Sequence, residues 1–140
     1  MKAINNMSIK ITKEQIDKAK KGTNYSTKQQ LHQHDDCIRM AYEWLDAQKK
    51  IKGKCSSTFA LKHIIEKWAG RYISMSDVEV AANMHKDIQG DYPWYNISSR
   101  LTEPSSSRLE NIREAYKHNN YREMHVPYGE KSSHYKIKEH

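Results

Sequence analysis

Four segments of the chain begin with a capping box, and this pattern constrains the fold more than any other feature. In a capping box, a Ser or Thr and a Glu or Gln three residues later bond the free backbone N–H groups at the start of a helix. The four pairs are Thr12 with Gln15, Ser26 with Gln29, Ser76 with Glu79, and Ser107 with Glu110. They predict four helices that begin at these positions.

Apolar side chains at the helical period extend these predictions and add a fifth helix. The predicted helices span residues 12–21, 26–50, 58–69, 76–85 and 107–117. Residues 71–74 have room to form a short extended segment between two of them. The predicted fold class is therefore all-α, a compact bundle of about five short helices with flexible ends.

The apolar content predicts a thin core. Ile, Leu, Val and Phe account for 22 of 140 residues, below the about one fifth typical of well-packed chains. One domain fits this length, and a thin core favours a homodimer that buries more apolar surface. We divide the chain into a basic arm with a short helix at 1–25, a helical domain at 26–118, and a flexible tail rich in Tyr, His and Lys at 119–140.

Charge and cysteine content narrow the class of partner. The net charge of +7 favours an acidic partner. It is spread as +5 over residues 1–30, zero over 31–116 and +2 over 117–140, however, and a neutral body is more typical of a protein that binds proteins. Only Cys37 and Cys55 are present, without a signal peptide or a long apolar run, so we expect a cytoplasmic protein with no membrane partner.

The stretch GDYPWYNISSRL at 90–101 predicts an amphipathic helix over residues 92–102. Trp94, Ile97 and Leu101 would share its apolar face. The opposite face would present Asn96, Ser99 and Arg100, with Tyr95 near its start. Asn and Arg side chains match the edges of adenine and guanine, whereas Ser and Tyr suit phosphates.

Together with the two predicted helices before it, this stretch resembles a helix-turn-helix or winged-helix module over residues 58–104. The resemblance implies DNA binding by the third helix. The chain departs from the common motif in two places: Gly90 follows later than the usual glycine of the turn, and Pro104 leads toward a helix where a wing would stand. The candidate nucleic-acid-binding residues are Tyr95, Asn96, Ser99 and Arg100, with Lys49, Lys50, Lys52 and Lys54 on phosphates.

No residue pattern predicts an enzyme, a cofactor or a metal site. The run LHQHDDC at 31–37 gathers possible ligands, but a helix would place His32 and Asp36 on one face and His34 and Cys37 on another. The chain lacks a phosphate-binding glycine loop, a nucleophile elbow and an HExxH pair. We therefore expect a protein that binds without catalysing.

Two functions remain open from the sequence. The first is a small non-enzymatic nucleic-acid-binding protein, with DNA favoured over RNA, that acts as a regulator. The alternative is a protein-binding accessory or inhibitory factor, for example from a phage or another mobile element, that blocks a larger partner. Tyr92, Trp94, Tyr95 and Arg100 would then contact that partner, because Tyr, Trp and Arg dominate interface energetics.

Overall fold

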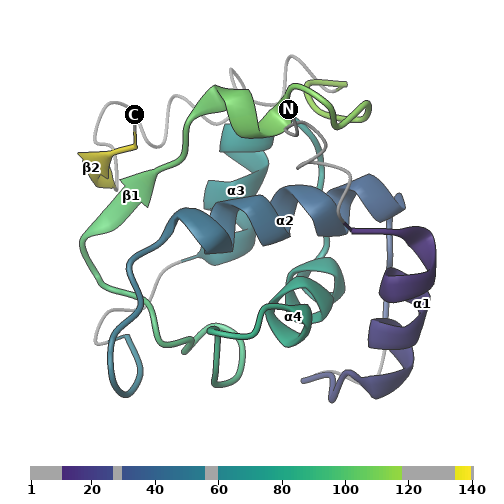
Figure 1. Cartoon of the computed structure of the whole chain (residues 1–140), viewed down its shortest axis with the longest axis horizontal. Helices are drawn as coiled ribbons and strands as arrows, with labels where there is room; N and C mark the ends of the chain where they lie inside the picture. The colour runs from purple at the N-terminus through teal and green to yellow at the C-terminus, as the bar shows by residue number, and fades with distance from the viewer. Residues whose placement is uncertain (1–10, 27–29, 56–59, 118–134, 140) are drawn as a thin grey trace, which may run out of the picture.

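The computed structural model describes residues 11–26, 30–55, 60–117 and 135–139. These ranges form four α-helices, a short 3-10 helix and a two-stranded parallel sheet (Figure 1). The elements are α1 (Lys13–Gly22), α2 (Asp35–Ala47), α3 (Leu61–Ala69), α4 (Met75–Met84), β1 (Leu101–Glu103), η2 (Ser106–Leu109) and β2 (Tyr135–Lys138). The predicted helical character is confirmed, but the prediction of a purely α-helical fold with five helices is wrong.

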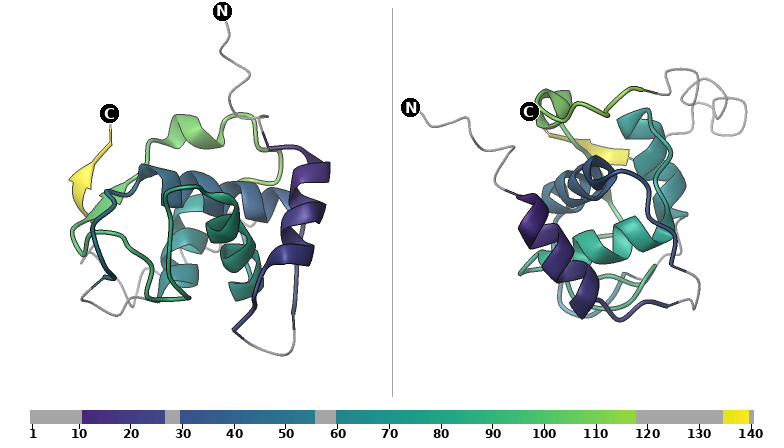
Figure 2. Two further views of the ribbon diagram at one scale, coloured as in Figure 1. Left: turned by 60° about the horizontal axis from the view of Figure 1, so that its bottom comes forward. Right: turned by 90° about the vertical axis from the view of Figure 1, so that its right-hand side faces the viewer.

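Helix α2 organises the core. It runs through the middle of the molecule and contacts α1, α3, α4 and η2 (Figures 1 and 2). Ile38, Ala41, Trp44 and Leu45 on this helix are fully buried. The apolar spacing identified in the sequence over this segment therefore does mark the core-facing side of a helix.

The capping boxes predict helix starts with mixed success. Thr12 and Gln15 form the predicted box at α1. Helix α4 begins two residues earlier than predicted, because Ser74 and Asp77 form its box. Asp77 thus takes the place, three residues after the cap, that Glu or Gln has in the common pattern.

The predicted helix start at Ser26 is wrong, since α2 begins only at Asp35, with His34 as its N-cap. Residues 30–34 form neither helix nor strand and are hydrogen-bonded to α4. The backbone N–H of Gln33 donates to a carboxylate oxygen of Asp77 at 3.2 Å. Tertiary hydrogen bonds thus replace the local helical bonds that the sequence pattern favoured.

The predicted helix over residues 92–102 is absent. This stretch turns at Gly90, which has φ of +107°, and contains a cis peptide bond between Tyr92 and Pro93. It then runs extended into β1, with an isolated antiparallel bridge between Ile97 and Lys50. Ile97 and Leu101 are buried as predicted, but the prediction that Trp94 shares their buried face is wrong, since 38% of its surface is exposed.

The last predicted helix and part of the predicted tail also differ. Ser107 lies in the 3-10 helix η2, and residues 110–117 form turns. β2 pairs in parallel with β1, so residues 135–138 of the predicted flexible tail form a strand. Residues 118–134 lie outside the described ranges.

Candidate nucleic-acid interface

The loop after α2 and the segment before β1 lie side by side, although more than forty residues separate them in the sequence. Three backbone hydrogen bonds join them: Ser98 N–H donates to Lys49 O at 2.8 Å, Ile51 N–H to Asn96 O at 3.0 Å, and Cys55 N–H to Tyr95 O at 2.9 Å. The predicted phosphate-binding lysines and the predicted base-contacting segment therefore share one surface.

Four cations on this surface are exposed: Lys49, Lys52, Lys54 and Arg100. Within the described ranges, none of the four has an ion-pair partner. Trp94, on the paired segment, has 38% of its surface exposed, and the ammonium of Lys54 lies 5.9 Å from its ring centroid. We call these five residues the basic loop surface.

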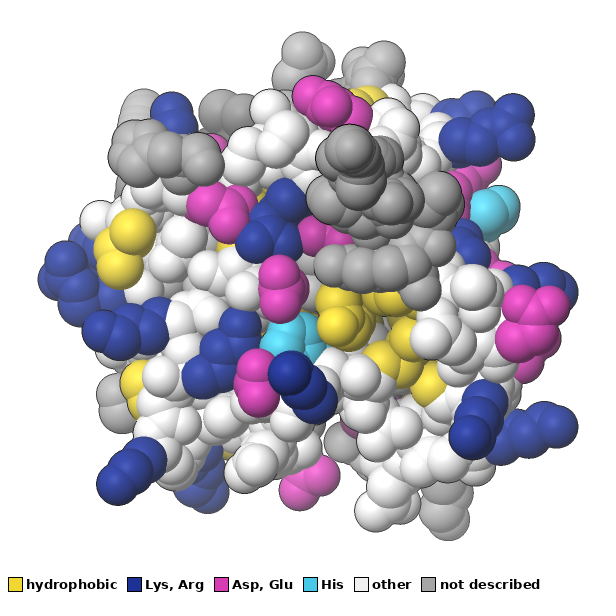
Figure 3. All heavy atoms as spheres, viewed as in Figure 1, with side chains coloured by type: hydrophobic (Ala, Val, Ile, Leu, Met, Phe, Trp, Pro, Cys, Tyr) yellow, Lys and Arg dark blue, Asp and Glu magenta, His cyan; other side chains and the backbone are white. Residues whose placement is uncertain are grey.

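The space-filling view agrees with this arrangement. Lys and Arg side chains gather over the lower left of the molecule in Figure 3, where the loop after α2 lies in Figure 1. Asp87 and Asp91 are also exposed on the neighbouring segment before Trp94. The surface is therefore basic at the loop and mixed in charge toward residues 87–91.

Two of the predicted contact residues have structural roles instead. Tyr95 is 3% exposed, and burial raises the pKa of its hydroxyl. The amide of Asn96 accepts from Gln89 N–H at 2.7 Å and donates to Asp87 O at 3.0 Å. It closes the turn that precedes the segment, so its hydrogen bonds are already committed within the chain.

The remaining predicted residues are partly covered. The ammonium of Lys50 donates to Asp46 O at 2.8 Å, and burial lowers the pKa of Lys50. Ser99 is half-buried. The Tyr92 hydroxyl accepts from Lys62 N–H at 3.1 Å, and burial raises its pKa. Among the four predicted partner-binding residues, Trp94 and Arg100 are the exposed ones.

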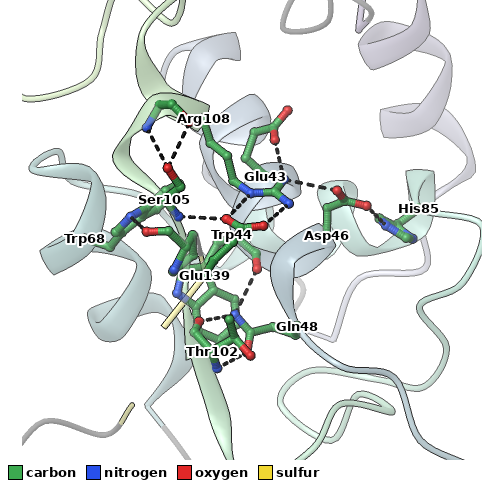
Figure 4. A network of polar contacts seen from close by, with 12 residues as sticks. Glu43, Trp44, Asp46, Gln48, Trp68, His85, Thr102, Ser105, Arg108 and Glu139 are labelled. Atoms are coloured by element: carbon green, nitrogen blue, oxygen red, sulfur yellow. Dashed lines mark hydrogen bonds and ion pairs between the residues drawn. The ribbon is translucent and has the colours of Figure 1, made fainter. Parts of the chain in front are cut away.

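Sequence reasoning missed a polar network centred on Arg108 (Figure 4). Its guanidinium contacts Glu43 at 2.7 Å, Asp46 at 3.0 Å and both carboxylate oxygens of Glu139 at 2.7 Å. These partners come from α2 and from the end of β2, more than sixty residues before Arg108 and about thirty after it. The acidic pair on α2, three residues apart on one face, was the only local signal.

His85 extends this network. Its Nδ1 accepts from Asp87 N–H at 3.1 Å, which leaves the ring proton on Nε2, 2.8 Å from a carboxylate oxygen of Asp46. Burial alone would raise the pKa of Asp46, but hydrogen bonds from His85 and Arg108 outweigh it and lower that pKa. The network therefore joins the ends of α2 and α4, η2 and the residue that follows β2.

The His and Asp residues of LHQHDDC each make a hydrogen bond or ion pair within the fold. His32 lies 2.8 Å from Asp77 through Nδ1, and Asp36 pairs with Arg39 at 2.6 Å. Cys37 is buried, which raises the pKa of its thiol to about 12. In the part of the chain that the structure describes, no group of three His, Cys, Asp or Glu side chains could hold a metal ion.

Comparisons with protein-family models, curated proteins and solved structures found no match to this chain. In the described ranges, no helix combines the length and the apolar composition needed to cross a membrane. The geometry of the chain's own residues therefore carries the functional argument.

Proposed function

We propose that this chain is a non-enzymatic nucleic-acid-binding protein that contacts its ligand through the basic loop surface. One observation carries the proposal. The backbone pairing between the loop after α2 and the segment before β1 brings onto one surface an exposed tryptophan and four cations that have no ion-pair partner among the described residues. Cations interleaved with an aromatic ring are the usual means of binding a nucleic-acid strand.

The cations and the tryptophan would make different contacts with the ligand. The lysines and Arg100 would neutralise phosphates and release counterions. The ring of Trp94 would stack on a base, which requires an accessible base face. Since residues 92–102 form no helix to enter a major groove, we propose single-stranded nucleic acid as the ligand. We expect DNA to bind more tightly than RNA.

The neutral net charge of residues 31–116 is compatible with this proposal. Many of the acidic side chains there are paired inside the fold, for example Glu43 with Arg108 and Glu114 with Arg71 at 3.1 Å. The unpaired cations face solvent instead. The pairs cancel, and exposed acids elsewhere in the segment, such as Asp87, Asp91 and Glu110, bring its sum to zero, so the loop after α2 is locally positive.

A salt-titrated binding assay tests the proposal. Fluorescently labelled single-stranded DNA, single-stranded RNA and random duplex of one length are each titrated with the chain from low to physiological salt. We expect the single strands to bind more tightly than duplex and the affinity to fall with salt. Absence of binding to all three at low salt would exclude the proposed function.

The second candidate is a protein-binding accessory or inhibitory factor, which the exposure of Trp94 also favours. A tryptophan with 38% of its surface exposed is a residue type that suits the centre of a protein interface. A stoichiometric protein partner that is recovered after nuclease treatment, and is lost with Trp94→Ala, would favour this alternative. A partner that disappears with nuclease would support the nucleic-acid proposal.

A further inference from the structure

The strand β2 is bound to the rest of the molecule as an extended peptide ligand would be. Its register pairs Leu101 with Tyr135 and Glu103 with Lys138, and Glu139 N–H donates to Glu103 O at 3.0 Å. Segments far apart in the sequence thus lie next to each other at the left of Figure 1.

Two side chains of this segment supply its specific contacts. The hydroxyl of Tyr135 accepts from the indole N–H of Trp44 at 2.9 Å. The carboxylate of Glu139 accepts two hydrogen bonds from the Arg108 guanidinium, both at 2.7 Å, and one from Ser105 N–H at 2.7 Å (Figure 4). A bidentate pair of this kind adds directional specificity as well as energy.

β1 offers one edge for this pairing. On its other edge, the side chain of Gln48 accepts from Thr102 N–H at 2.9 Å and donates to Thr102 O at 2.8 Å. We call the site that β2 occupies the C-terminal groove. It consists of the β1 edge that pairs with β2 together with Trp44, Ser105 and Arg108. Its donors converge on an extended chain that has a hydroxyl and, four residues later, a carboxylate.

The strand that occupies this groove is weakly covered. β1 and β2 contain three and four residues, and a two-stranded sheet of that length has little stability of its own. Lys136, Ile137 and Lys138 are exposed, Ile137 to 38%. Few buried contacts and exposed backbone hydrogen bonds place the strand at the low-stability end of the fold.

Contacts outside β2 also position the groups that β2 meets. Arg108 keeps Glu43 and Asp46 as partners on its Nη1 atom, so its orientation is fixed from α2 even without Glu139. Trp44 is fully buried in α2. Both recognition groups therefore belong to the helical body.

We propose that the C-terminal groove is a binding site for an extended segment of another protein with a tyrosine and, four residues later, an acidic residue. The chain's own C-terminal strand occupies the site in cis and competes with that partner. Recognition is by strand addition to β1, with the two side chains conferring specificity. The basic loop surface has no part in this proposal.

A labelled peptide tests the competition directly. The probe is fluorescein-labelled HYKIKEH, the sequence of residues 134–140, titrated with the full chain and with its Glu139→Gln variant. The variant weakens the cis strand and leaves the groove intact. We expect the peptide to bind the variant about tenfold more tightly than the parent, because a charge-assisted pair no longer holds the competitor.

Control variants distinguish specific recognition of the peptide from a general destabilisation of the chain. Glu110→Gln makes the same chemical change at an exposed acid that has no ion pair among the described residues, and it should bind the peptide like the parent. Tyr135→Phe, which removes only one hydroxyl, provides a second loosened chain. A probe whose own Glu is replaced by Gln should lose most of its affinity for every chain.

Equal affinity for parent, Glu139→Gln and Tyr135→Phe would overturn the proposal, as would a probe that binds without its acid. Gel filtration gives a further outcome. Dimers of the Glu139→Gln chain that the peptide disperses would identify the occupant as a second copy and overturn the assignment to another protein.

Discussion

Replacing Lys52 and Lys54 with glutamine should halve the salt dependence of nucleic-acid binding. The basic loop surface has four exposed, unpaired cations. If each neutralises one phosphate of a single strand, the slope of log K against log salt is about −2.8, and about −1.4 for the double variant. Between 50 and 200 mM salt the parent should lose ~50-fold in affinity and the variant ~7-fold.

Anisotropy of a labelled single-stranded oligonucleotide measures both slopes. The control is the double variant Lys18→Gln and Lys21→Gln on α1, which removes two exposed cations on the opposite side of the molecule (Figure 1). It should retain the parent's slope. If the α1 variant lowers the slope as much as the loop variant does, phosphate binding is spread over the surface, and the reasoning about the loop is refuted.

Three further predictions follow from single contacts. Trp94→Leu should cost about 1–3 kcal/mol of single-strand binding while leaving the salt slope unchanged; titrations of both chains at two salt concentrations check this, and a changed slope would contradict a stacking role. Asn96→Ala should lower the free energy of unfolding by about 1–3 kcal/mol through its two lost hydrogen bonds; an unchanged urea midpoint would contradict this. Hydrogen bonds from Arg108 hold the pKa of Glu139 below its ordinary 4.5, so the stability from this pair is present above pH 4.5 and lost as pH falls through the native pKa. Hydrogen exchange of Glu139 N–H, compared with amides in α2, should therefore lose protection in acid in the parent but not show this acid-dependent loss in Glu139→Gln. The same pH dependence in both chains would contradict the prediction.

The helical core could be predicted because its signals are local. The box at Thr12 and the apolar spacing of α2 and α3 depend on residues within a few positions of each other. The start of α2 could not be predicted, because the bonds that hold residues 30–34 come from Asp77, over forty residues away.

The conformation of the segment before β1 also depends on contacts that its local sequence does not reveal. Trp94, Ile97 and Leu101 have helical spacing, yet the chain is extended there because Gly90 turns it and the loop after α2 pairs with its backbone. An ideal Cβ on Gly90 would lie 2.7 Å from Trp94 O, a close approach that the sequence does not reveal.

Some residues of the candidate site were identified from the sequence, but a different backbone structure from the predicted one brings them together. Lys52 and Lys54 were predicted from a run of lysines, and Arg100 from the polar face of a helix that does not form; backbone pairing between the two segments brings them onto one surface. Tyr95 and Asn96 were misplaced because residue type alone does not separate a surface side chain from one used to close a turn.

Tryptophan fluorescence tests the central claim most directly. Trp44 and Trp68 are 0% and 4% exposed, so Trp94 is the indole that an added ligand can reach. Titration with single-stranded DNA at low salt should quench the emission, reverse on addition of salt, and leave the Trp94→Phe chain unquenched. Quenching that persists in Trp94→Phe, or binding by anisotropy with no quenching in the parent, would contradict a nucleic-acid interface at the basic loop surface.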